Sequence, residues 1–204
     1  MSIGALAFIG VTGVVGMRFV EPLLFGRPCC APSHEAKAYL KDLYTYERAW
    51  VQEFDAFSED MNQMGVEPEL GNRYTYFSAP RGRVLTTGER QTPRREVNGS
   101  RPTAYQIVAA DSGSPKFRGT FETFAKTGCP LTLATLPDGT RAGLGVTLPA
   151  DGSGPGVFIG AAAGNIDGDP TPDCWSIATV ERVAADGTRI APGAPYNELN
   201  DVEF

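Results

Sequence analysis

Histidine is almost absent from this chain, since His34 is the single histidine among 204 residues. One histidine cannot build a multi-histidine metal centre, and any Ser-His-Asp arrangement would have to use His34. We expect His34 to face solvent in a structural role. No glycine-rich phosphate-binding motif follows a predicted strand, and no nucleophile lies beside a recognisable base. We therefore expect no enzymatic activity and no required cofactor.

Positive charge is also scarce. The chain has 18 Lys and Arg against 24 Asp and Glu, for a net charge of −6. Such a balance argues against general nucleic-acid binding, which needs a surface that neutralises phosphate. A hydrophobic content of 42 % indicates a folded protein. The 24 glycines and 16 prolines favour short strands and turns over a helical bundle.

The four cysteines do not have the spacing of a metal site. In an oxidising compartment, Cys129 and Cys174 would pair and close a loop of about 45 residues, worth roughly 3–4 kcal/mol. The adjacent residues Cys29 and Cys30 would form a strained ring with each other. Free thiols, acylation and inter-chain contacts remain open for this second pair.

The first 32 residues form a separate, apolar segment. From Ile3 to Phe25 the sequence is apolar apart from Arg18 and Glu21, and as a helix this stretch would be about 34 Å long, enough to cross a bilayer. No Lys or Arg precedes the run, which favours an uncleaved N-terminal anchor over a cleaved signal peptide. We predict a membrane or filament-core helix segment over residues 1–32 and a globular domain over residues 33–204.

The globular domain is predicted to open with an amphipathic helix over residues 33–57, with Ser33 as its N-cap. The apolar residues recur at helical spacing, at Ala36, Leu40, Leu43, Trp50 and Phe54. Charged residues take the other positions, which we assign to solvent: Lys37, Lys41, Asp42, Glu47, Arg48 and Glu53.

From Gly71 onward the pattern becomes that of a sheet. The stretch GNRYTYFSAP alternates Tyr74, Tyr76 and Ser78 before a proline. Asp138-Gly139 and Asp186-Gly187 read as tight hairpin turns. No helical pattern alternates with the strands, so we predict an α+β fold with an antiparallel sheet over about residues 72–190. The further strands are expected at Arg83–Thr87, Ala104–Ala109, Leu131–Leu136, Ala142–Leu148, Gly156–Ala161 and Trp175–Val183.

A basic segment runs from Arg81 to Arg101, with six arginines against two glutamates. It is either a solvated loop or a docking surface for an acidic partner, such as a neighbouring subunit or an anionic glycan. The candidate partner-binding residues are Arg90, Arg94 and Arg95.

Two long motifs resemble the type IV pilins of myxobacteria and their relatives. The first is HEAKAYLKDLYTYERAWVQEFDAFSEDMNQMGVEPELGNRYTYF, and the second is AAGNIDGDPTPDCWSI. Together they cover about half of the chain, and neither motif extends into the middle of the chain, about residues 79–128. In this register the sequence starts about where a processed pilin would. Its N-terminus departs from the family, because Ala5 stands where pilins carry a glutamate.

The resemblance implies a pilin-like roll, in which a long N-terminal helix, apolar and then amphipathic, packs on an antiparallel sheet. It implies a structural subunit, or a minor or accessory component, of a type IV pilus-like filament or related secretion apparatus. The chain would be anchored in the inner membrane, with its domain in the periplasm or at the cell surface. It would assemble with like or different subunits through the N-terminal helix. The alternative is a membrane-anchored periplasmic module that binds a glycan or a protein.

The segment GNIDGDPTPDCW places Asn165, Asp167, Asp169 and Asp173 within nine positions. This echoes the start of an EF-hand loop, but the glycine is misplaced and no glutamate closes the loop. A looser calcium loop is possible, and some pilin relatives hold calcium near their C-termini. The alternative is a turn whose side chains bond their own backbone.

Overall fold

The computed structural model describes residues 31–91, 104–111, 121–166 and 171–199. The chain divides into a unit of residues 1–31 and a second unit of residues 32–204. The predicted apolar helix of residues 1–32 lies, apart from its last two residues, outside the described ranges. Among the helices within these ranges, none is both long and apolar enough to cross a membrane.

Helix α2 spans Ala31–Phe54, so both of its predicted ends were wrong by two or three residues. Ser33 lies inside the helix and is not its N-cap. Pro32 lies in the first turn, where its missing N–H would have no helical partner in any case. The helix ends because Asp55 adopts a left-handed conformation with φ of 55°. Its N–H still donates to the Val51 carbonyl at 3.0 Å, which closes the last turn.

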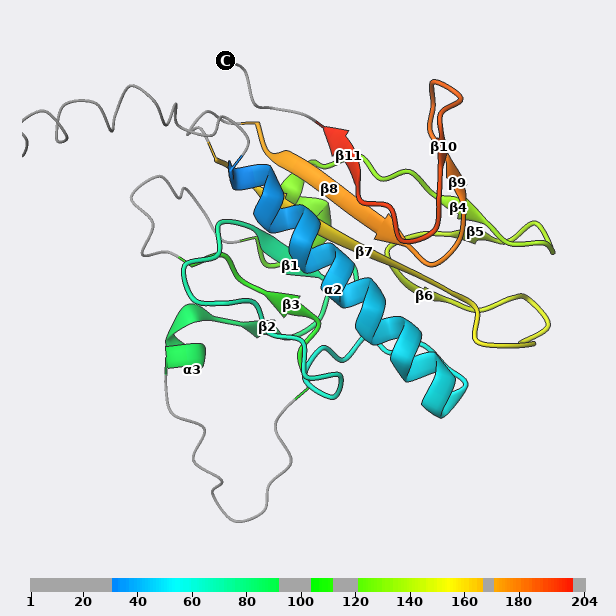
Figure 1. Ribbon diagram of the computed structural model, residues 1–204, viewed down its shortest axis with the longest axis horizontal. Helices are drawn as coiled ribbons and strands as arrows, with labels where there is room; N and C mark the ends of the chain where they lie inside the picture. Colours follow the sequence, from blue (N-terminus) through cyan, green and yellow to red (C-terminus); the bar gives the residue numbers. More distant parts are fainter. Residues whose placement is uncertain (1–30, 92–103, 112–120, 167–170, 200–204) are drawn as a thin grey trace, which may run out of the picture. The chain divides into compact units, whose positions relative to one another are not determined.

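The main sheet has seven strands, and α2 lies diagonally across it (Figure 1). The strand order is β11-β8-β7-β1-β3-β2, and β6 pairs with β7 beside this path. Every pair is antiparallel, as predicted for the sheet, except the short pair β2–β3, which is parallel. The strands are β1 (Thr75–Phe77), β2 (Val84–Leu85), β3 (Ile107–Val108), β6 (Gly145–Thr147), β7 (Val157–Gly164), β8 (Asp173–Ala178) and β11 (Tyr196–Leu199).

Two hairpins complete the strands, and both contain a predicted turn. One turn holds Gly139 with φ of 86° and the other Gly187 with φ of 85°, conformations that favour glycine. Asp138 and Asp186, which precede these glycines, each accept a backbone hydrogen bond two residues further on. The hairpins are β4 (Ala134–Thr135) with β5 (Arg141–Ala142), and β9 (Arg182–Val183) with β10 (Arg189–Ile190); the short helices are α3 (Thr87–Gln91) and η1 (Phe124–Thr127).

Several strand boundaries differ from the sequence prediction. The predicted strand 142–148 divides into β5 and β6, and the predicted strand 175–183 divides into β8 and β9. The predicted strands 83–87 and 104–109 shrink to the two-residue strands β2 and β3. The sheet also continues past residue 190 to β11, which the prediction missed.

The core lies between α2 and the sheet, and β7 is built for close approach. Phe158, Gly160, Ala162 and Gly164 alternate along β7 and so share one face. A Cβ placed on Gly160 would lie 2.8 Å from Leu43 Cδ2, so this side of β7 contacts α2. The opposite sheet face holds two smaller clusters, one formed with the β4–β5 hairpin and one with residues around η1.

Candidate functional site

Cys129 and Cys174 form a disulfide, as predicted, with their Cα atoms 5.9 Å apart. Cys129 follows η1, and Cys174 is the second residue of β8. The bond therefore ties the segment after η1 to β8, which lies next to the edge strand β11. Disulfides persist in the periplasm and outside the cell, which indicates an oxidising compartment. Cys29 and Cys30 lie outside the described residues.

Asp173, a predicted calcium ligand, is fully buried and bonded within the core. Its Oδ2 accepts hydrogen bonds from the Tyr74 hydroxyl and the Trp175 Nε1, both at 2.6 Å. Its Oδ1 accepts one from Asn197 Nδ2 at 3.2 Å. Burial, followed by the Asp173 charge, raises the pKa of Tyr74 far above its ordinary value. Asp173, in β8, is thus bonded to the residue just before β1 and to β11.

The remaining predicted calcium ligands are not brought together in the described part of the chain. Asn165 is buried just after β7, whereas Asp167 and Asp169 lie outside the described residues. No cluster of three or more metal-ligating acids, histidines or cysteines occurs among the described residues. Calcium binding stays a prediction, and Asp173 is already occupied by three donors.

Arg90, a predicted partner-binding residue, contacts the protein's own loop. Its guanidinium donates to the Pro68 and Glu69 carbonyls and to Asn72 Oδ1, which fixes α3 against this loop. The structure thus gives Arg90 an internal role that the sequence did not indicate. Arg94 and Arg95 lie outside the described residues, so their predicted role stays a prediction.

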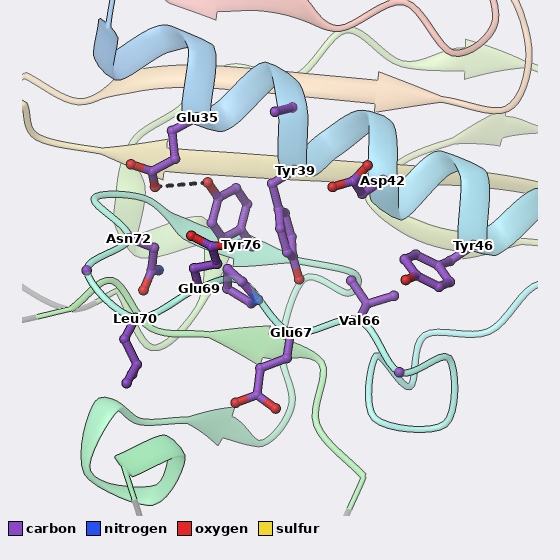
Figure 2. A pocket seen from close by; sticks show the side chains of 14 residues that line it. Glu35, Tyr39, Asp42, Tyr46, Val66, Glu67, Glu69, Leu70, Asn72 and Tyr76 are labelled. Carbon is purple, nitrogen blue, oxygen red and sulfur yellow. Dashed lines mark hydrogen bonds between the residues drawn. The ribbon is translucent and has the colours of Figure 1, made fainter.

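A groove of about 520 Å³ opens between α2 and the loop of residues 65–72 (Figure 2). We call it the helix–loop groove. Sequence reasoning missed it, because its two walls come from segments about thirty residues apart whose meeting depends on the tertiary fold. It is lined by Glu35, Ala38, Tyr39, Asp42 and Tyr46 of α2, by residues 65–72, and by Tyr76 of β1.

The groove combines aromatic rings with carboxylates. The rings of Tyr39 and Tyr76 pack against each other at a tilt of 40°, with their centroids 3.9 Å apart. The Glu35 Oε1 accepts hydrogen bonds from the Tyr76 hydroxyl at 3.1 Å and from the Arg73 N–H at 2.8 Å. Burial, followed by the Glu35 charge, raises the pKa of Tyr76 well above its ordinary value. Asp42 is exposed on the same side of α2.

A buried ion pair joins the C-terminal strands. Arg182 Nη1 lies 3.2 Å from Glu198 Oε1, and both side chains are almost completely buried. The same Nη1 donates to the Thr132 carbonyl at 3.0 Å and to Ser176 Oγ at 2.8 Å. Glu198 Oε2 accepts from the Thr132 N–H and hydroxyl. This network locks β9 and β11 to the segment that follows the disulfide.

Glu47 is buried in α2, although the sequence prediction assigned it to solvent. Its Oε2 accepts a hydrogen bond from the Ser58 N–H at 3.1 Å, whereas no described residue bonds its Oε1. Burial raises the pKa of Glu47 from 4.5 to about 8, and the Glu59 charge adds to this rise. Glu47 therefore carries a proton at neutral pH.

One long helix packs on a largely antiparallel sheet, and a disulfide joins two segments in the C-terminal half of the chain. This is the α+β arrangement expected of a pilin-like domain. A family model described as Type IV pilin PilA matches residues 30–173. The chain therefore belongs to the type IV pilin PilA family.

A curated relative agrees with this assignment. The chain is 33 % identical over 180 residues to the protein named Type IV major pilin protein PilA from Myxococcus xanthus (strain DK1622). The similarity covers 82 % of this chain and 76 % of the relative.

Proposed function

We propose that this chain is a structural subunit of a type IV pilus-like surface filament. The observation that carries the proposal is the family match over residues 30–173, together with the similarity to a major pilin over most of both chains. In this proposal residues 1–32 anchor the subunit in the inner membrane and then pack into the filament core.

The described domain supports a role in assembly rather than catalysis. Helix α2 packs one face against the sheet. On the rest of α2, the side chains of Tyr46 and Phe54 remain 45 % and 51 % exposed. Both aromatic side chains would be available for contacts with neighbouring subunits in the proposed filament. The disulfide favours a domain in the periplasm or outside the cell.

The proposal is tested by shearing surface filaments from cells that express the tagged chain. The expected result is that the chain enriches in the sheared filaments, whereas an unrelated inner-membrane protein stays with the cells. Recovery of the chain solely from membranes, as a monomer, would contradict the filament role. That outcome would favour the alternative of a membrane-anchored module that binds a glycan or a protein.

A further inference from the structure

The helix–loop groove has the lining that a cationic side chain needs. Its walls carry the carboxylates of Asp42 on α2 and of Glu69 on the loop, and both residues are exposed (Figure 2). Within the described ranges neither of these two carboxylates forms a hydrogen bond or an ion pair with another residue. Glu35 adds a third carboxylate, of which Oε1 is bonded to Tyr76 and Arg73.

The groove also has apolar surface beside these charges. Tyr46 is 45 % exposed at one end of the groove, and Leu70 is 55 % exposed on the loop. An arginine suits such a surface, because its alkyl stem packs on apolar groups and its planar guanidinium stacks on aromatic rings. The same guanidinium can pair with carboxylates through two parallel hydrogen bonds.

The chain itself contains arginines that could complement the carboxylates of the groove. The basic segment 81–101 has six arginines, but two of the described ones are already engaged: Arg83 pairs with Glu89, and Arg90 holds the loop of its own chain. Arg94 and Arg95 follow directly in the sequence and lie outside the described residues. Each copy therefore carries an acidic groove and, elsewhere in its sequence, an oppositely charged segment.

We propose that the helix–loop groove of one copy receives Arg94 and Arg95 of the next copy. This inference rests on the proposed function and names the contact between subunits. A contact between two different patches is heterologous, and repeating it generates an open filament whenever the rotation does not close a ring. Each copy then offers one groove and one basic segment, as end-to-end growth requires.

Charge reversal tests the proposal in the full chain, with the amount of subunit in sheared filaments as the readout. One variant carries Asp42→Arg and Glu69→Arg, and another carries Arg94→Glu and Arg95→Glu. Each is expected to lower the filament fraction by at least about tenfold, the ratio that corresponds to 1.4 kcal/mol of lost contact energy. A control with Glu53→Arg and Asp151→Arg reverses two exposed carboxylates outside the groove and should leave the fraction unchanged.

Restoration of assembly distinguishes this contact from misfolding. All four reversals on one chain should restore filaments, and so should co-expression of the two doubly reversed chains, because each then fits the other. Normal filaments from either doubly reversed chain alone would overturn the inference, as would a lack of restoration in both experiments.

Restoration on one chain but not by co-expression would also overturn the inference, because the basic segment would then fill the groove of its own copy. Absence of the unaltered chain from filaments would be a different failure. It would contradict the proposed function, and the inferred contact between subunits would then have no filament in which to occur.

Discussion

Glu47 occupies a position that the helical repeat assigns to the core. Residues 36, 40, 43, 47, 50 and 54 follow one another at alternating intervals of three and four, and position 47 is the charged one. The carboxyl group therefore faces the core and stays protonated at neutral pH, because burial raises its pKa to about 8.

Glu47→Gln should stabilise the protein above neutral pH. Between about pH 4.5 and 8 the unfolded chain has lost this proton and the folded chain has kept it, so stability falls as pH rises. The slope from this group is about 1.4 kcal/mol per pH unit. Urea unfolding between pH 5 and 9 measures how the free energy of unfolding depends on pH. Glu47→Gln should lack the part of this dependence that comes from Glu47. Glu53→Gln, on the exposed side of α2, should keep it, and superimposable profiles for Glu47→Gln and the unaltered chain would contradict the idea.

Removing one partner of the buried Arg182–Glu198 pair should lower the free energy of unfolding strongly. Burial lowers the pKa of Arg182, while Glu198 favours its charged form. Removing the carboxylate by Glu198→Ala leaves a buried cation without its partner, and we expect a loss of about 3–5 kcal/mol in the free energy of unfolding. The exposed pair between Arg189 and Glu181 is the control, and Arg189→Ala should have little effect in the same unfolding assay. Equal losses in the two variants would argue against a special role for burial.

At the scale of elements, the close contact between α2 and β7 depends on small side chains. A Cβ on Gly160 would approach Leu43 Cδ2 to 2.8 Å and the Phe158 ring to 3.2 Å. Helix and strand can therefore pack directly, with Leu43 against the strand backbone. Gly160 permits this contact, whereas Gly164, on the same face of β7, makes room for the Arg73 carbonyl and the Tyr74 ring.

Gly160→Val should destabilise the fold by about 1–3 kcal/mol, because it overfills this contact. The free energy of unfolding from urea titration measures the loss. Gly88→Ala, in α3, is the matched control, since an added Cβ there meets no atom within 4 Å. That control should be neutral or slightly stabilising. An unchanged stability for Gly160→Val would show that α2 can shift away at little cost.

Elements with strong local signals could be predicted from the sequence. The apolar repeat of Ala36, Leu40 and Leu43 identified α2, and the Asp-Gly pairs identified both hairpin turns. The pairing of Cys129 with Cys174 was predicted as well, since the other two cysteines are adjacent. Strand β11 was missed because its residues, YNEL, show no clear apolar alternation.

The buried polar groups were largely beyond sequence reasoning. Nothing local distinguishes Arg182 and Glu198 from surface charges, because their burial results from contacts between β9, β11 and Thr132. Asp173 was predicted as a metal ligand from its acidic neighbours, yet it bonds Tyr74, which lies 99 positions away. Glu47 alone had a usable signal, its place in the apolar repeat of α2.

At the scale of the whole molecule, charge is unevenly distributed along an acidic chain. The basic segment 81–101 contrasts with the net charge of −6, and the acidic loop from Asn165 ends in the core at Asp173. With Asp173 bonded inside the core, the calcium prediction depends on Asn165, Asp167 and Asp169.

If this loop binds calcium, a chelator should lower the melting temperature of the full chain. An ion that binds the folded state but not the unfolded one stabilises the fold, and this stabilisation grows with the logarithm of the ion concentration above its Kd. Asp167→Ala should remove the sensitivity to chelator, whereas Asp151→Ala, in an exposed turn, should preserve it. Thermal unfolding in calcium and in chelator is the measurement, and equal melting temperatures for the unaltered chain would retire the calcium prediction.

The disulfide between Cys129 and Cys174 has a mechanical consequence for a subunit under tension. It joins residues 45 positions apart, and at about 3.4 Å per extended residue the enclosed chain hides roughly 150 Å of contour length. A pulling force transmitted along the backbone bypasses this loop through the covalent bond. The β4–β5 hairpin, β6 and β7 are thereby shielded from stretching, and an oxidised subunit can lengthen by about 150 Å less than a reduced one.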